Sequence, residues 1–127
     1  MPTDGMSRYS IRADIVAALK EIEEIKAVAA TYPENWKVLP CAVYSCESRP
    51  AGKNKSTVEF LTQWTITIEL FTNKSGIGRI AESVQQAINQ MGFSDVRVKD
   101  ANIKNLNRKI ITVSGVVNNR TLQITRN

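Results

Sequence analysis

The residues that could do chemistry in this chain are few and scattered. The sequence contains no histidine, so the usual general base, the Ser–His–Asp triad and histidine metal ligands are missing. Cys41 and Cys46 are the two cysteines, and their odd spacing in a predicted strand puts them on opposite faces, where a disulfide between them is geometrically poor. A zinc site would need both thiolates and scattered carboxylates. We therefore expect no catalytic, cofactor-binding or metal-binding residue, and no enzymatic activity.

The carboxylates and the glycines near the middle of the chain do not change this expectation. Glu21 and Glu24 are neighbours on a predicted helix but lie opposite its apolar stripe, as on a solvated face. Glu59 and Glu69 lie on one face of a predicted strand, roughly 33 Å apart and too far for paired carboxylate catalysis. Residues 74–78 contain Gly-x-Gly before a helix, where anions can bind, but not the Gly-Lys-Ser/Thr of a P-loop. We interpret them as a turn that starts the helix.

The most regular pattern in the chain is an alternation over residues 58–72. The even positions, which share one face, are Val58, Phe60, Thr62, Trp64, Ile66, Ile68 and Leu70. The odd positions are mostly polar and include Glu59, Gln63, Thr65, Thr67 and Glu69. Because successive strand side chains point to opposite faces, the pattern predicts a long strand with one apolar and one polar face. One or two helices cannot cover that much sheet, which favours assembly with copies or partners over a pocket enzyme.

The remaining elements follow from periodicity and turn residues. A helix is predicted over 11–30, capped by Ser10 and ended before Pro33, and a second over 76–91, capped by Ser75 and ended at Gly92. Further strands are predicted over 38–47, 93–99, 108–117 and 121–125, with a loop over 48–57, a polar linker over 100–107 and a turn at Asn118–Asn119. The loop is either a plain surface loop or an arm that orders against a neighbouring molecule.

These elements predict an α+β fold in the order α-β-β-α-β-β-β. The sheet, mixed or antiparallel, should have four to five strands and carry two amphipathic helices on one face. Residues 1–10 are expected to be a flexible N-terminal segment, and residues 11–127 a single domain. Since no long apolar run and no signal-peptide pattern is seen, we expect no membrane contact and assembly in the cytoplasm.

Positive charge is concentrated in the second part of the chain. Residues 1–72 hold eight Lys/Arg and nine Asp/Glu, whereas residues 73–127 hold nine and three, which gives the net charge of +5. This asymmetry is typical of a nucleic-acid surface, of a surface facing an oppositely charged protein, or of a plain basic face. No aromatic residue follows Phe93, which disfavours a stacking platform for single strands. A basic module that contacts nucleic acid without reading its sequence stays an alternative.

Several segments together resemble the small tail-completion proteins of Gram-positive phages and prophages, which are similar to tail terminators. The resemblance lies in residues 64–76, 79–88 and 91–93. The family pattern is a strand ending in aromatic-Thr-Asn-Lys, a helix, Gly-Phe, and basic strands. Residues 70–74 and 121–126 fit it, and the helix at 15–25 is similar too. Residues 94–109 depart from it, with a polar stretch at 102–107 in place of an apolar one.

The resemblance implies a tail-terminator-like fold and a structural role in a virion or phage-tail-like particle assembled in the bacterial cytoplasm. Such proteins form a ring, usually a hexamer, that caps the head-proximal end of the tail tube and joins it to the head connector. In a contractile tail, a contractile injection system or a phage-derived bacteriocin, the equivalent ring is called a collar. The implied partners are copies of this chain, the tail tube protein, a sheath or head-connector protein, and DNA contacted non-specifically in the channel.

We expect the interfaces to use the basic loop, the polar face of the long strand and the C-terminal basic strands. The residues are Arg49, Lys53, Lys55, Glu59, Gln63, Thr65, Thr67, Glu69, Arg108, Lys109, Arg120 and Arg126. The uneven charge predicts a head-to-tail contact in which the acidic-leaning half of one subunit meets the basic half of the next.

Overall fold

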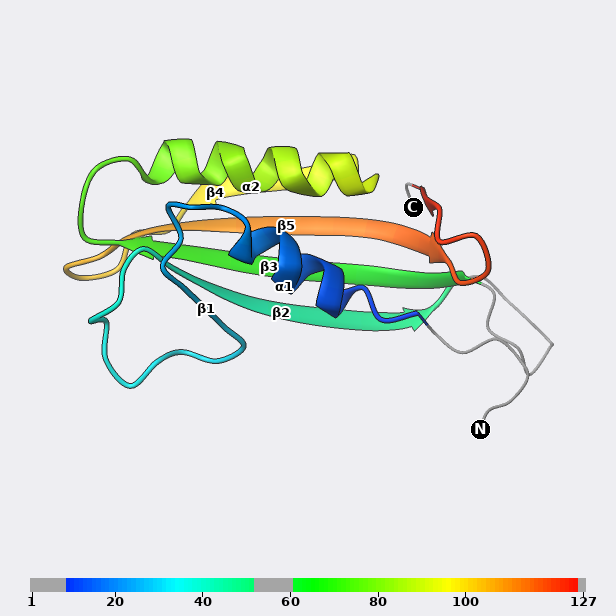
Figure 1. Ribbon diagram of the computed structural model, residues 1–127, viewed down its shortest axis with the longest axis horizontal. Coiled ribbons are helices and arrows are strands. Elements are labelled where there is room, and N and C mark those ends of the chain that lie inside the picture. The colour runs from blue at the N-terminus through cyan, green and yellow to red at the C-terminus, as the bar shows by residue number, and fades with distance from the viewer. Residues whose placement is uncertain (1–8, 52–60, 126–127) are drawn as a thin grey trace.

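The computed structural model describes residues 9–51 and 61–125 of the chain. The helices and strands in chain order are α1 Arg12–Lys20, β1 Ala27–Ala29, β2 Cys41–Pro50, β3 Leu61–Thr72, α2 Ile77–Met91, β4 Asp95–Asp100, β5 Asn107–Asn118 and β6 Ile124–Thr125. They form an α+β protein with a six-stranded mixed sheet and two helices (Figure 1). The predicted class is therefore confirmed, while the strands are more numerous than the four to five expected.

The sheet is built around the long antiparallel pair of β3 and β5. The strand order is β1-β2-β3-β5-β4, and β6 pairs with the end of β5. The β1–β2 pair is parallel and all other pairs are antiparallel. Consequently β2 and β4, which lie on either side of the β3–β5 pair, run in opposite directions.

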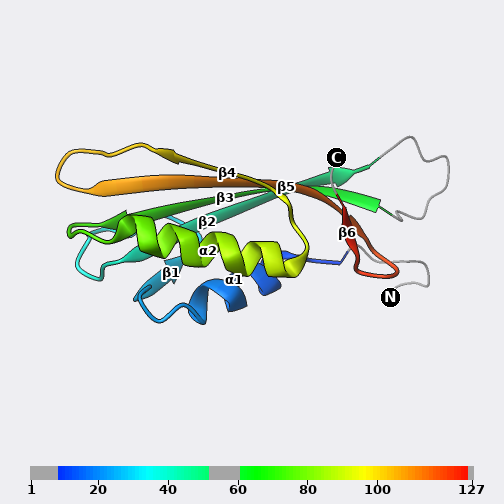
Figure 2. The same ribbon diagram turned by 90° about the horizontal axis from the view of Figure 1, so that it is seen from above.

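Both helices pack on the same face of the sheet, as the sequence predicts (Figure 2). The even positions of β3 that the structure describes are all buried beneath them: Thr62, Trp64, Ile66, Ile68 and Leu70. The four apolar residues among them join one core cluster with Ile15 and Leu19 of α1 and Val84 and Ile88 of α2. The predicted alternation is confirmed over 62–70, whereas Val58 and Phe60 lie outside the described residues. Among the described helices, none has the length and apolar character needed to cross a membrane.

The first helix is shorter than predicted. It ends at Lys20 instead of continuing to residue 30, and residues 27–29 form the parallel strand β1. The N–H groups of Lys26 and Ala27 donate to the carbonyl of Pro40, at 2.8 and 3.3 Å. The edge of β2 therefore satisfies backbone groups that the helix would have used, and this pairing outweighs the helical propensity of the segment.

Neither predicted serine caps its helix. The N-cap residues are Ile11 for α1 and Gly76 for α2, and neither makes a side-chain cap hydrogen bond. Gly76 has φ of 102°, a conformation that side-chain-bearing residues rarely adopt. Glycine geometry, and not Ser75, thus sets the turn from β3 into α2. At the other end, Gly92 terminates α2 with φ of 116°, as predicted.

Several strand boundaries also differ from the prediction. β2 continues through residues 48–50, which the sequence pattern assigns to the loop, and residues 52–57 of that loop lie outside the described residues. The predicted linker over 100–107 is a tight connection in which Ile103 and Leu106 form an isolated bridge. The returning strand after the Asn118–Asn119 turn is reduced to β6.

Asn119 links the start of the described chain to the sheet. Its Oδ1 accepts a hydrogen bond from the N–H of Tyr9 at 3.0 Å, and its Nδ2 donates to Oγ1 of Thr62 at 2.9 Å. The hydroxyl of Tyr9 donates to Asp14 at 2.6 Å. This hydrogen bond is the main cause of the raised pKa of Tyr9. The approach to α1 is therefore fixed against the end of β3 and β5.

Gly115 offers a test of the packing between β5 and the segment that follows α2. A Cβ atom at Gly115 would lie 2.6 Å from the ring of Phe93, which is buried. We expect Gly115→Ala to lower the free energy of unfolding by about 1–3 kcal/mol because the ring must move. The control Gly78→Ala, in α2 and with nothing within 4 Å of the new Cβ, should raise it by up to about 1 kcal/mol. Urea unfolding followed by tryptophan fluorescence measures both, and equal effects would contradict this packing.

Candidate interaction surface

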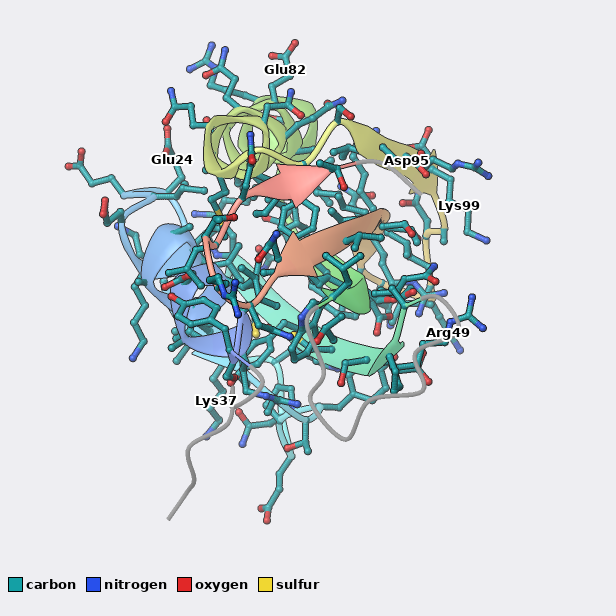
Figure 3. The ribbon with its side chains drawn as sticks, turned by 90° about the vertical axis from the view of Figure 1, so that its right-hand side faces the viewer. Glu24, Lys37, Arg49, Glu82, Asp95 and Lys99 are labelled. Atoms are coloured by element: carbon teal, nitrogen blue, oxygen red, sulfur yellow. The ribbon has the colours of Figure 1, made fainter. Side chains whose placement is uncertain are left out.

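The face of the sheet that points away from both helices is left open over most of its length by the residues that the structure describes, and we call it the outer face. Its polar residues come from four strands and are Ser45, Glu47, Arg49, Gln63, Thr65, Thr67, Glu69, Asp95, Arg97, Lys99, Arg108, Thr112 and Ser114. In the end-on view, Arg49, Asp95 and Lys99 lie on this side, and Glu82 lies with the helices (Figure 3).

The centre of the outer face carries hydroxyl groups and no charge. Thr65 lies opposite Ser114, and Thr67 lies opposite Thr112, so that four neighbouring positions on β3 and β5 are Ser or Thr. All four are half-buried although no helix covers them. Removing water from a neutral hydroxyl costs less free energy than removing water from a charged group, so a partner can cover this region at a lower cost. Charged residues lie on the flanking strands, with Glu47 and Arg49 on β2 and Asp95, Arg97 and Lys99 on β4.

One end of the outer face is covered by the segment over residues 32–39. The ring of Trp36 packs on Phe71 with centroids 4.4 Å apart, and Tyr32 meets Phe71 edge-on at 6.0 Å. Cys41, Val43, Phe71 and Leu106 form a second buried cluster, against which Trp36 and Leu39 pack. The cover stops there, and the Thr and Ser positions farther along the strands lie beyond it.

Glu69 fixes this cover to the sheet. Both of its carboxylate oxygens accept the hydroxyl of Tyr32, at 2.8 and 2.9 Å, and Oε1 pairs with Nη1 of Arg108 at 3.1 Å. Arg108 also donates through Nε to the carbonyl of Ala101 and lies 6.0 Å from the ring centroid of Phe71. The hydrogen bond to the Glu69 carboxylate is the largest cause of a raised pKa of Tyr32, with burial and the negative charge adding to it.

The structure brings together half of the residues predicted as an interface. Six of them share the outer face: Arg49, Gln63, Thr65, Thr67, Glu69 and Arg108. Arg49 donates to Oε1 of Gln63 from Nε and Nη2, at 3.1 and 2.9 Å. The remaining predicted residues within the described chain, Lys109 and Arg120, lie elsewhere.

Lys109 and Arg120 are separated from the outer face for different reasons. Lys109 follows Arg108 in β5, so strand alternation turns it to the helix side, where it pairs with Asp100. Arg120 is exposed in the turn between β5 and β6. The other predicted residues, Lys53, Lys55, Glu59 and Arg126, lie outside the described residues.

Sequence reasoning missed four charged residues that β2 and β4 contribute to the outer face. They are Glu47, Asp95, Arg97 and Lys99, and their alternation with Cys46, Val96 and Val98 was a usable signal. It also missed the cover, although Tyr32 and Trp36 are aromatic residues in a predicted loop and Phe71 is an apolar residue at an odd position. Such residues usually find a buried partner.

The described residues offer little support for catalysis or metal binding. Burial raises the pKa of the Cys41 and Cys46 thiols, which disfavours the reactive thiolate. Within 9–51 and 61–125, no three His, Cys, Asp or Glu side chains cluster as metal ligands would. An open hollow of about 590 Å³ lies at the start of α2, with Lys26, Lys74 and Arg79 in its lining. Its buried hydroxyl, Thr72, already accepts the N–H of Lys74 at 3.2 Å.

Comparison with known proteins does not place the chain in a family. No protein-family model matches it, and a search of curated proteins gives no match. The geometry of the outer face and the flanking strands is therefore the basis for a functional proposal.

The Tyr32–Glu69 hydrogen bond predicts a pH dependence. Because the pKa of Tyr32 is raised in the folded state, the bond stabilises the cover below the ordinary tyrosine pKa of about 10, and this contribution is lost as pH rises through the folded value. We expect Glu69→Gln to return the pKa of Tyr32 toward its ordinary value. NMR titration of the ring carbons resolves the tyrosines. In the control Asp14→Asn, the pKa of Tyr9 should fall and that of Tyr32 should not. An unchanged Tyr32 titration in Glu69→Gln would contradict the contact.

Proposed function

We propose that this chain is a structural subunit that assembles with copies of itself into a ring, expected to be a hexamer. The ring would cap the head-proximal end of a phage or phage-like tail tube, stop tube polymerisation and join the tail to the head connector, or act as the collar of a contractile particle. Its partners would be the tube protein and a head-connector or sheath protein.

The observation that supports this proposal most directly is the one-sided sheet. Both helices pack on one face, and the described chain covers only the Phe71 end of the other. The open part is a hydroxyl-rich surface flanked by charges of both signs, which suits contact with another protein more than binding of a small molecule. A subunit of an assembly needs such a surface.

The segment that carries the family resemblance has a defined local role. Phe71 anchors the cover on the outer face, Thr72 is buried and accepts the N–H of Lys74, and Gly76 starts α2. The aromatic-Thr-Asn-Lys pattern therefore lies where the central strand turns into the helix. Residues with these roles support a shared fold more than a shared reaction.

The alternative, a module that binds nucleic acid, has less support. Three of the C-terminal cations are paired within the chain: Arg108 with Glu69, Lys109 with Asp100, and Arg97 with Asp95 at 3.6 Å. Paired cations present less positive potential to a phosphate backbone than the sequence count suggests. Contact between the ring and DNA in its channel is compatible with the remaining charge.

Negative-stain imaging of the purified protein tests the proposal, alone and mixed with tubes assembled from the tail tube protein of the same particle. We expect annular particles with a central channel, and rings on one end of each tube. The association should weaken at high salt, because charges on β2 and β4 flank the contact surface. Tubes that grow to the same lengths and bear bare ends at all protein concentrations would contradict the capping function.

A substitution in the centre of the outer face tests which surface is used. Thr67→Lys places a charge among the hydroxyls, and burying it against a partner should lower the fraction of capped tube ends at least about tenfold. The control Gln86→Lys makes the same charge change on an exposed position of α2. Both variants should unfold within a few degrees of the parent, since both positions are accessible to water. Equal capping by the two variants would show that the outer face is not the contact surface.

A further inference from the structure

Within residues 9–51 and 61–125, part of β2 and all of β4 lie at the two edges of the sheet without a further strand beside them. On one side, β1 pairs with β2 only over residues 41–43, and no described strand pairs with that side of β2 beyond Val43. On the other side, β4 pairs with β5 alone among the described strands and lies at the rim of the sheet (Figure 2). Exposed strand edges are templates for pairing with another chain, and proteins usually protect them.

Two hydrogen bonds show which backbone groups point outward. The N–H of Ala51 donates to the carbonyl of Leu61 at 3.0 Å, so by alternation the amides of Tyr44 and Cys46 on β2 point away from β3. The N–H of Ala101 donates to the carbonyl of Arg108 at 2.9 Å. By the same alternation, the amides of Val98 and Asp100 on β4 point away from β5.

The directions of the two edges are compatible with each other. Because β2 and β4 run in opposite directions, a neighbouring copy that is related by rotation about an axis along the strands would place its β4 antiparallel to β2. The outer faces of the two copies would then be continuous. A contact of this kind uses different surfaces on the two copies and repeats around a ring when the rotation closes.

The charges select one register for this pairing. When Arg97 of one copy lies opposite Glu47 of the next, Asp95 lies opposite Arg49, and both pairs are oppositely charged. A shift by two residues in one direction places Arg97 opposite Arg49, and a shift in the other places Asp95 opposite Glu47. Like charges directly opposite one another destabilise a strand pair. The favoured register also pairs Val98 with Cys46 and Asp100 with Tyr44, whose amides point outward.

We infer that copies of this chain join edge to edge, with β4 residues Asp95–Asp100 of one copy antiparallel to β2 residues Tyr44–Arg49 of the next. The pairs Val98 with Cys46 and Asp100 with Tyr44 form about four backbone hydrogen bonds, and two ion pairs on the outer face fix the register. β4 ends at Asp100, where β1 begins to occupy the same edge of β2. This inference rests on the self-assembly in the proposed function, but not on the identity of the tube or particle.

Engineered cysteines test the pairing and its register. In a Cys46→Ala background, one protein carries Ser45→Cys and a second carries Lys99→Cys; these positions face each other across the proposed contact. Within one chain they are three strand spacings apart, about 14 Å, too far for a disulfide. Across the contact, Cα atoms about 4.5 Å apart allow one. We expect a disulfide dimer on oxidation of the mixture and not of either protein alone. Cross-linking of either protein with itself would instead indicate a two-fold contact and overturn the inference.

Charge reversal gives an independent readout in the unmodified background. Glu47→Lys and Arg97→Glu should each weaken self-association about tenfold in sedimentation equilibrium, and the double variant should recover most of the loss. Glu82→Lys on α2 is the matched control and should associate as the parent does. Equal association by all variants, or a chain that stays monomeric at every concentration, would overturn the inference.

The failure of this inference can be told apart from failure of the proposed function. Rings that cap tubes, but in which the Ser45→Cys and Lys99→Cys proteins give no mixed disulfide, would retain the function and exclude this contact. A mixed disulfide that forms as expected in a protein that never binds tubes would retain the contact and exclude the capping function.

Discussion

The strict alternation of β3 is the constraint on which the rest of the structure depends. Its buried even positions are apolar except for Thr62, whose hydroxyl accepts from Asn119, and Thr72, whose hydroxyl accepts from the N–H of Lys74. Each large apolar side chain contributes about 1.5–3 kcal/mol by leaving water. A slip of one residue in the register would exchange the buried and exposed sets. Since only one face of the strand offers apolar contacts, both amphipathic helices pack on that face. The outer face is the consequence: a sheet surface that the described chain does not complete.

The chain completes that surface only where the alternation is interrupted. Phe71 is apolar at an odd position, and there the segment 32–39 packs on the outer face. Glu69 holds the segment through Tyr32 and is itself neutralised by Arg108. Two residues that looked available for a neighbour in the sequence are therefore occupied within the protomer. The hydroxyl-rich centre and the charges on β2 and β4 remain as the surface that a partner could contact.

The sequence predicted the parts of the fold that have a strong local period. The long strand, the second helix, its end at Gly92 and the placement of both helices on one face followed from alternation and apolar stripes. Two predictions were wrong: the first helix does not extend beyond Lys20, and residues 27–29 form a strand. These residues pair with β2, which is distant from them in the sequence, so the pairing is not visible in the local pattern. Helical propensity cannot anticipate that competition.

Only part of the candidate surface was predicted from the sequence, and the reason is again that the rest depends on strand pairing. Residues on β3 could be assigned to a face from their own alternation, but Arg108 and Lys109 could not be separated without the register of β5. The contributions of β2 and β4 depend on which strands become the rim of the sheet, which is a property of topology and not of any single segment. The opposite directions and complementary charges of these two rims suggest how identical subunits could continue the sheet from one copy to the next.

Amide hydrogen exchange in dilute and in concentrated protein tests most directly whether copies complete the sheet. The account predicts that the amides of Tyr44, Cys46, Val98 and Asp100 exchange more slowly as the protein concentration rises, while the amides of residues 120–123, which donate hydrogen bonds within their own turn, do not change. Exchange on β2 and β4 that is independent of protein concentration, in solution and on assembled particles, would contradict it.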